Sequence, residues 1–132
     1  MSALGAQIAA QLHGGQVIEL IGDVGAGKTT FTKGLARGLG IAEAVQSPTF
    51  TISRRYQGKR WHLAHYDFYR LDDAGIMQDE LAETLANRDT ITVIEWAGSV
   101  AGILPAEHIT ITITADAVDA NARHVDIQGI NI

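Results

Sequence analysis

The segment that most constrains this chain is Gly22–Thr29, whose sequence GDVGAGKT matches the phosphate-loop pattern G-x-x-x-x-G-K-[ST] in full. It follows Val17–Ile21, a short apolar run typical of a buried parallel strand. A helix is predicted from Thr29 to Leu39, with Gly40 just past its end. The glycines let the backbone curl so that successive N–H groups converge on phosphate oxygens, and the helix start adds its dipole. The alternative is a glycine-rich turn that binds nothing, and pattern and context together argue against it.

This segment predicts a set of nucleotide contacts. The phosphate-binding residues would be Gly22, Asp23, Val24, Gly25, Ala26, Gly27, Lys28 and Thr29. Lys28 would reach the β- and γ-phosphates, and the hydroxyl of Thr29 would ligate Mg²⁺. We expect Lys28 to lie in the loop and to pack little against the core. Thr30 would either touch a phosphate or only cap the helix start.

Two acids stand where apolar runs end. Asp67 closes the run 61–66 (WHLAHY), and Glu95 closes the run 91–94 (ITVI). An acid at the end of a buried strand beside a phosphate loop is suited to hold Mg²⁺ or to orient the attacking water. Asp67 and Glu95 are therefore candidate catalytic and metal-binding residues, and the sequence does not decide which acid does which. The alternative for each is an ordinary carboxylate that faces solvent.

The remaining elements follow from periodicity and turn residues. We predict a helix at 3–12, a hairpin of strands 49–56 and 60–67, a helix from Asp72 or Asp73 to about Ala86, a strand at 90–95 and a final pair of strands at 109–114 and 123–130. His62 and His65 are three residues apart on a strand, so we expect them on opposite faces and not as a metal pair. This order of elements predicts an α/β protein with a mixed sheet.

Length and composition narrow the function classes. The chain has 132 residues, which predicts a single domain over 1–132, and it has no cysteine. No apolar run approaches membrane-spanning length, and the first Lys or Arg is Lys28, so we expect a soluble cytoplasmic protein that does not contact a membrane. The net charge is −5, which argues against nucleic-acid binding by bulk electrostatics.

The charges are unevenly distributed along the chain. From Lys28 to Arg70 there are eight basic and two acidic residues, giving +6, whereas 71–132 holds two basic and eleven acidic residues, giving −9. The basic segment as a whole suggests an anionic ligand near the middle of residues 28–70. The alternative is chance clustering of charges on solvated faces.

Four sequence blocks together carry a family resemblance. They are GDVGAGKTTF at 22–31, SPTF at 47–50, DFYR at 67–70 and VIEW at 93–96. In order and spacing they resemble the TsaE family, also called YjeE, the small ATPases of bacterial tRNA threonylcarbamoyladenosine biosynthesis. The resemblance covers nearly the whole chain. With the elements above, it implies a P-loop NTPase-like three-layer sandwich with a mixed, mostly parallel central sheet and a β-hairpin-rich C-terminal part.

The resemblance also implies roles and partners. Thr30 would join the phosphate loop, Thr49 would lie near the γ-phosphate, and Asp67 would sit close to Mg²⁺ and the attacking water. Glu95 would bind Mg²⁺, and Trp96 would flank the nucleotide. Arg54, Arg55 and Arg70 are candidates to stabilise transition-state charge, and only Arg70 lies in a family motif. The favoured alternative for each arginine is a solvated charge or a salt-bridge partner. ATP and Mg²⁺ would be the cofactors. ATP hydrolysis would support TsaB and TsaD, which transfer threonylcarbamoyl to an adenosine of tRNA, so that contact with tRNA would be indirect.

Two departures from the family and two rival functions accompany this assignment. Family members usually carry an extra strand before the first helix, so we expect a sheet that lacks an edge strand. The segment 76–88 is acidic where relatives are often glycine-rich and aromatic, which would alter any partner contact there. The rival functions are a stand-alone small-molecule kinase and a nucleotide-binding interaction module without turnover. As an ATPase with one core and no lid domain, the isolated chain is expected to be slow and to be accelerated by its partners.

Overall fold

A six-stranded sheet forms the centre of the molecule, in a computed structural model that describes residues 1–22, 27–46, 53–68 and 75–130. The strands are β1 (Val17–Ile21), β2 (Ser53–Gln57), β3 (His62–Asp67), β4 (Thr90–Glu95), β5 (Ile109–Ala115) and β6 (Arg123–Gln128). Their order across the sheet is β2-β3-β4-β1-β5-β6. The four central strands are parallel, and the edge strands β2 and β6 run antiparallel to β3 and β5. The sheet is thus mixed and mostly parallel, as predicted.

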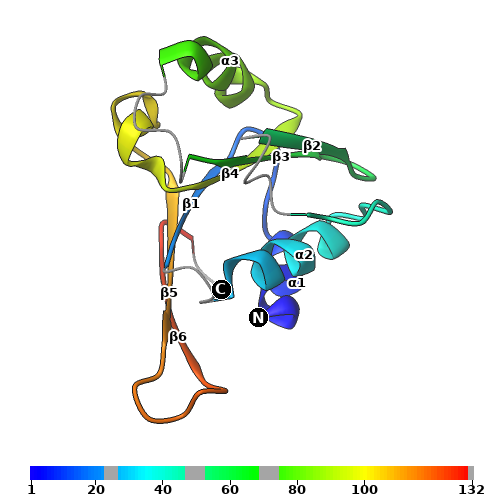
Figure 1. The fold of residues 1–132 in the computed structure, drawn as a ribbon. Helices are drawn as coiled ribbons and strands as arrows, with labels where there is room; N and C mark the ends of the chain where they lie inside the picture. Colours follow the sequence, from blue (N-terminus) through cyan, green and yellow to red (C-terminus); the bar gives the residue numbers. More distant parts are fainter. Residues whose placement is uncertain (23–26, 47–52, 69–74, 131–132) are drawn as a thin grey trace.

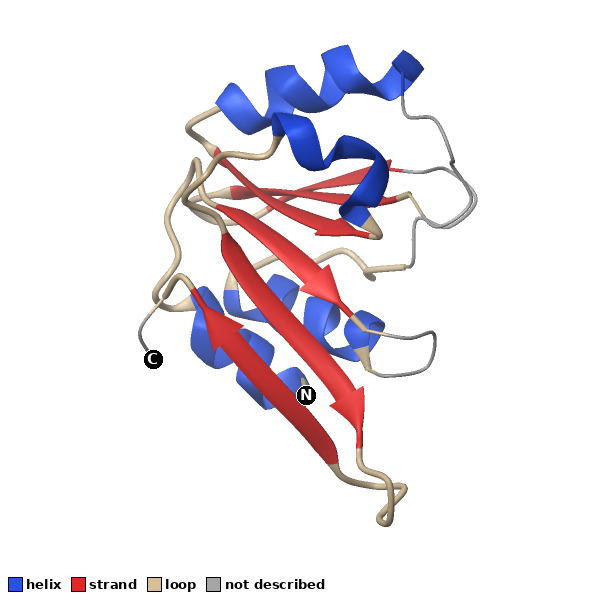
Figure 2. Cartoon of the chain, turned by 90° about the vertical axis from the view of Figure 1, so that its left-hand side faces the viewer, coloured by secondary structure: helices blue, strands red, loops and turns tan. Residues whose placement is uncertain are grey.

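Helices cover both faces of this sheet (Figures 1 and 2). On one face lie α1 (Ser2–Ala9) and α2 (Lys28–Gly38). On the other lie α3 (Gly75–Ala86) and the 3₁₀ helix η1 (Ala97–Ile103). The resulting three layers agree with the predicted sandwich, and β5 and β6 form the predicted C-terminal hairpin, whose tip projects beyond the helices in Figure 1.

Each face of the sheet builds its own apolar core, because alternate side chains of a strand point to opposite faces. The core under α1 and α2 includes Leu20, Phe31, Leu63 and Val93. The core under α3 and η1 is smaller and includes Tyr66. All six residues of β4 are buried, which suits a central strand covered on both faces.

Close contact between α1 and α2 depends on glycine. A Cβ placed on Gly34 would lie 2.0 Å from the main-chain oxygen of Ser2, and one on Gly5 would lie 2.3 Å from that of Phe31. Neither distance is compatible with a side chain, so these glycines let the two helices approach backbone to backbone. This contact fixes the helix that begins directly after the phosphate loop.

The predicted elements are all present, with shifted ends. The first helix ends at Ala9 and the second begins at Lys28, whereas 3–12 and a start at Thr29 were predicted. Gly40 has a φ of 78°, the left-handed conformation expected just past a helix end. The predicted strand residues 49–52 and helix residues 72–74 lie outside the described part of the chain. None of the helices in the described ranges is both long and apolar enough to cross a membrane.

Candidate functional site

Three parallel strands end side by side and place the predicted acids together. In the sheet register, Asp67 on β3 pairs with Glu95 on β4, and Glu95 pairs with Leu20 on β1. The N–H of Phe68 donates to the carbonyl of Glu95 at 3.1 Å, so the ends of β3 and β4 stay joined. Both acids are buried, and neither is the solvent-facing carboxylate considered as an alternative. The carboxyl ends of parallel strands are the usual ligand-binding edge of such sheets.

Lys28 is the first residue of α2 and reaches these strand ends. Its Nζ lies 3.5 Å from Oε1 of Glu95, and the two side chains are only 6% and 5% exposed. The same Nζ lies 4.3 Å from the centre of the Trp96 ring, within the range of a cation–π contact. The prediction that Lys28 lies in a loop and packs little is therefore wrong. Its position on the first turn of α2, facing the sheet, buries it between an acid and an indole ring.

Glu95 has a second partner, His65, which the sequence interpretation did not assign to the site. His65 Nε2 lies 2.6 Å from Glu95 Oε2, and the His65 side chain is completely buried on β3. His65 stands two residues before Asp67, so both point to the α2 face of the sheet, whereas His62 is exposed. The prediction that the two histidines are separate is confirmed. The sequence did contain a signal for this placement. His65 lies two residues before Asp67, and residues two apart on a strand share a face.

Trp96 directly follows Glu95 and leaves the strand abruptly. Its φ is 56°, a left-handed backbone conformation that no other non-glycine residue in the described ranges adopts. Trp96 directly precedes η1. Its side chain is 37% exposed, which is unusual for so large an apolar group. This turn points the indole ring back over Lys28. Residues held in this backbone region often belong to functional sites.

A pocket of about 360 Å³ opens beside Lys28 and Trp96. It is lined by Glu19, Leu20, Ile21, Gly22, Lys28, Trp96, Ala97, Thr112 and Thr114. Its volume lies within the range typical of small-molecule sites. Glu19, Thr112 and Thr114 were not expected here, because β1 and β5 show only alternating or apolar patterns. Adjacency of β1 and β5 in the sheet brings them to the pocket.

The remaining predicted site residues divide into two groups. Among the described ones, Gly22 lines the pocket, Gly27 caps α2 with a φ of 110°, Thr29 is partly buried and Thr30 is exposed. Because Gly27 occupies the cap position, the alternative that Thr30 caps the helix is wrong. The other predicted residues lie outside the described ranges, and they are Asp23, Val24, Gly25, Ala26, Thr49 and Arg70.

The donors present suit Mg²⁺ held jointly with a phosphate group. In the described part of the chain, no three His, Asp or Glu side chains gather into a cluster that could hold a metal ion alone. Mg²⁺ commonly takes one or two carboxylates and completes its shell with substrate phosphates and water. The Glu95 carboxylate, directed at the phosphate-loop lysine, fits such a site, and the Thr29 hydroxyl lies on the next residue of α2.

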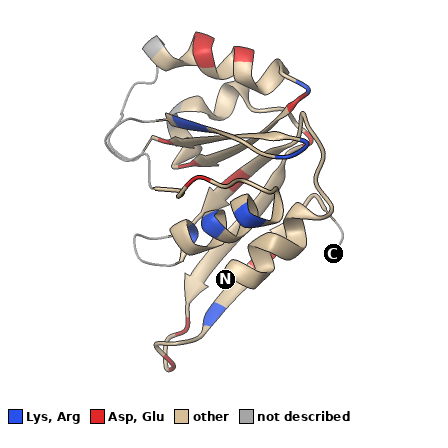
Figure 3. Cartoon of the chain, turned by 90° about the vertical axis from the view of Figure 1, so that its right-hand side faces the viewer, with Lys and Arg blue, Asp and Glu red and all other residues tan. Residues whose placement is uncertain are grey.

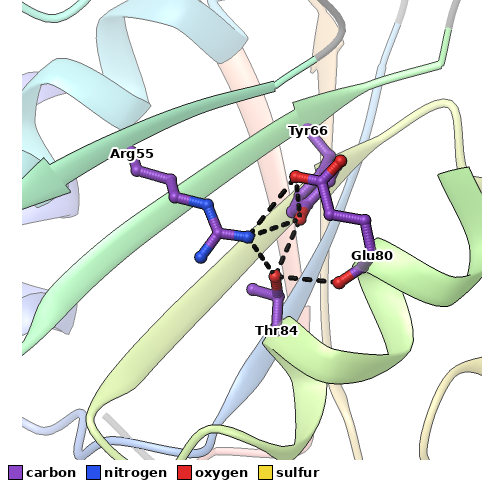
Figure 4. Close-up of polar contacts among 4 residues, drawn as sticks. All are labelled: Arg55, Tyr66, Glu80 and Thr84. Atoms are coloured by element: carbon purple, nitrogen blue, oxygen red, sulfur yellow. Dashed lines mark hydrogen bonds and ion pairs between the residues drawn. The ribbon is translucent and has the colours of Figure 1, made fainter.

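A second polar cluster, shown in Figure 4, has a structural role. Arg55 Nη2 on β2 donates to Thr84 Oγ1 at 2.6 Å and lies 3.4 Å from Glu80 Oε1 on α3. The Tyr66 hydroxyl joins Thr84 Oγ1 at 2.9 Å, and burial raises the pKa of Tyr66 above its usual 10.0. These contacts tie α3 to the β2–β3 hairpin. Arg55 is thus an ion-pair partner, as the sequence interpretation favoured.

Comparisons with known proteins agree in their result. The family model "Threonylcarbamoyl adenosine biosynthesis protein TsaE" matches residues 1–125. The tRNA threonylcarbamoyladenosine biosynthesis protein TsaE of Bacillus subtilis is 43% identical over 99 residues, which cover 75% of this chain and 61% of that protein. The protein of the same name from Streptomyces coelicolor is 36% identical over 138 residues, covering 98% of this chain and 90% of the relative.

A solved structure shares the fold as well. The crystal structure of YdiB from Bacillus subtilis superposes with a TM-score of 0.74 at 36% sequence identity, over 94% of this chain and 74% of that one. The six-stranded mixed sheet between helices is therefore a P-loop NTPase-like fold that this relative shares. With the family model matching nearly every residue, the chain belongs to the TsaE family of threonylcarbamoyl adenosine biosynthesis proteins.

Proposed function

We propose that this chain binds ATP with Mg²⁺ and hydrolyses it, as a subunit that works with TsaB and TsaD in forming threonylcarbamoyladenosine on tRNA. The observation that carries the proposal is the 3.5 Å contact between Lys28 and Glu95. A phosphate-loop lysine and a strand-end acid have been brought to one point from segments 67 residues apart. P-loop enzymes need this pair, because the cation holds the β- and γ-phosphates and the acid serves the metal beside them.

Each residue then has a distinct task. Lys28 leaves Glu95 and binds the β- and γ-phosphates, and its position on the first turn of α2 adds the helix dipole. Thr29 and Glu95 hold Mg²⁺, which when bound neutralises charge on the phosphate oxygens. Asp67, paired with Glu95 across the sheet, orients the attacking water. Catalysis here consists of positioning and charge, since phosphoryl transfer needs little covalent help from the protein.

The pocket beside Trp96 would receive the nucleoside part of ATP. Trp96 offers an exposed aromatic ring at the pocket wall, and Ile21 supplies further apolar surface. Thr112 and Thr114, which also line the pocket, are residues with hydroxyl groups. An aromatic ring with a few polar groups is the composition expected of a small-molecule site. It supports a nucleotide as the ligand without choosing between bases.

The charge distribution supports a protein partner. Figure 3 shows Lys and Arg along α2, whereas Asp and Glu lie on α3 across the sheet. Lys33 and Arg37 are exposed on α2, and Asp79 and Glu83 are exposed on α3. Such separated surfaces favour oriented docking. A partner could also complete a site that is open to solvent at Trp96, as trans-acting groups do for other P-loop enzymes.

The proposal includes the setting of the reaction. The chain contacts tRNA only indirectly, through the complex with TsaB and TsaD, and it works in the cytoplasm.

Calorimetric titration with ATP and GTP, with and without Mg²⁺, tests binding directly. We expect Mg²⁺-dependent ATP binding that Lys28→Ala weakens severely, whereas Lys33→Ala, an exposed lysine of the same helix, leaves it unchanged. Phosphate release measures turnover. No ATP binding by the wild-type chain would refute the proposal. Binding without turnover when partners are present would support the interaction module, and transfer to a small-molecule acceptor would support the kinase.

A further inference from the structure

His65 is the buried titratable group of the site that the proposed mechanism leaves without a task. It lies in the middle of β3 with no exposed surface, and its Nε2 is 2.6 Å from Glu95 Oε2. Its other ring nitrogen, Nδ1, is buried and has no hydrogen-bond partner within the described ranges. A polar ring in an apolar core is costly unless its hydrogen bonds are used. In the part of the chain that the structure describes, the hydrogen bond of its side chain is to Glu95.

The two oxygens of Glu95 have different partners. Oε1 faces the Nζ of Lys28, and Oε2 faces the Nε2 of His65. A carboxylate can only accept, so the His65 nitrogen that faces it donates a proton to the hydrogen bond. The hydrogen bond therefore fixes the ring with its proton on Nε2. Both partners together determine the orientation of the carboxylate.

These partners differ in their freedom to move. Lys28 carries its charge on a flexible four-carbon stem and, on the proposed function, turns to the phosphates when ATP binds. His65 is a short ring enclosed between strands, in register with Val93 of β4, and cannot follow. When Lys28 leaves, Oε1 is released while Oε2 stays bonded to His65. The carboxylate of Glu95 therefore keeps its orientation while Mg²⁺ binds to the released oxygen.

We infer that His65 is the positioning residue of Glu95, holding one carboxylate oxygen so that the other is presented to Mg²⁺ once Lys28 has moved to the phosphates. The inference rests on the proposed function, since it gives Glu95 a metal to bind. Groups that hold a metal ligand in place commonly change metal affinity by about 10- to 100-fold when they are removed. His65 touches no reacting atom and acts only through Glu95.

Trp96 provides the readout, because Lys28 lies against its ring and must leave when a phosphate binds. In a Trp61→Phe background, Trp96 is the single tryptophan of the chain. Its fluorescence is followed during ATP titration in the presence of EDTA, and then during Mg²⁺ titration of the ATP-loaded protein. The variants are His65→Leu, which removes the donor, and His65→Gln, which restores an N–H at similar reach. His62→Leu, at the exposed first residue of the same strand, is the matched control.

We expect His65→Leu to weaken Mg²⁺ binding by about tenfold or more while changing ATP affinity in EDTA by less than about threefold. His65→Gln should recover most of the Mg²⁺ affinity, and His62→Leu should behave as the parent protein. Unchanged Mg²⁺ affinity in His65→Leu, or an equal loss of ATP affinity in EDTA, would overturn the inference. A parent protein with no response to ATP would instead refute the proposed function, and with it this inference.

A wild-type measurement decides the matter if His65→Leu does not fold. The proton on Nε2 of His65 is observable by nitrogen-15 NMR of the imidazole ring. We expect it to remain hydrogen-bonded, with little change in shift, when ATP and Mg²⁺ are added. Loss of that hydrogen bond on metal binding would show that His65 does not hold Glu95 in the working state.

Discussion

Removing the charge of Glu95 is expected to destabilise the fold even when its size is kept, as in Glu95→Gln. Two unit charges 3.5 Å apart attract by about 5 kcal/mol at an effective dielectric constant of 20. Desolvation of both groups offsets much of this attraction, so the intact pair contributes little net stability. The amide variant, however, leaves the Lys28 ammonium buried without its counter-charge. Breaking a buried pair in this way costs about 3–5 kcal/mol, and we expect the lower end because the lysine stem can turn towards solvent.

A double-mutant cycle separates this effect from general damage. Lys28→Met should destabilise by a similar amount, since it leaves the Glu95 carboxylate with His65 alone. The double variant Lys28→Met/Glu95→Gln removes both charges and should lose less than the sum of the two single losses, by about 2 kcal/mol. The assay is urea unfolding followed by circular dichroism, with the free energy taken from the linear extrapolation.

The chain contains a matched control. The Arg55–Glu80 pair has a similar distance, 3.4 Å, but its side chains are 54% and 40% exposed. Glu80→Gln should therefore cost less than about 1 kcal/mol. If Glu95→Gln cost no more than Glu80→Gln, or if the cycle were additive, then the Lys28–Glu95 contact would not be the buried pair on which the site depends.

Three further predictions concern the acid, the helix contact and the hairpin tip. Asp67→Asn should lower ATP turnover by about 100-fold with little effect on Mg²⁺-free ATP binding, because it disturbs positioning, and normal phosphate release would contradict this. Gly34→Ala should lower stability by about 1–3 kcal/mol in thermal unfolding, because its Cβ would overlap α1, whereas Gly102→Ala enters open space and should be neutral. Hydrogen bonds from the N–H of Asp119 and from the His124 ring on β6 lower the pKa of Asp116 from 3.8 to about 2. That stabilisation is present above pH 3.8 and lost as the pH falls through about 2, and an NMR titration midpoint near 3.8 would contradict it.

Local pattern was sufficient to predict the elements and the edge of the sheet that carries the site. The runs that end at Asp67 and Glu95 are apolar, and parallel strands end at one edge, so the sequence placed both acids near the phosphate loop. What it did not contain was the strand order. That β4 lies between β1 and β3 determines which side chains touch Glu95, and this order arises from tertiary packing.

The partners of Glu95 were missed for this reason. His65 is one of two histidines in β3, and a histidine in a largely buried strand is more often structural. Its role appears only once β3 and β4 are in register. The burial of Lys28 depends on how α2 packs on the sheet. The close backbone approach of α1 and α2 at Gly5 and Gly34 is part of that packing and is not visible in the local sequence pattern. Thr112 and Thr114 belonged to an alternating strand, and the adjacent β1 brings them to the pocket.

We propose that this chain is an ATPase which its partners complete, and phosphate release measures that activity without an intermediate step. Turnover of ATP is measured for the purified chain alone and then with saturating TsaB and TsaD, with Lys28→Ala in parallel as the background. We expect slow release by the chain alone, a clear rise with both partners, and none above background for the variant. A fast rate that the partners do not change, or no release in either condition, would show that the chain is not a partner-dependent ATPase.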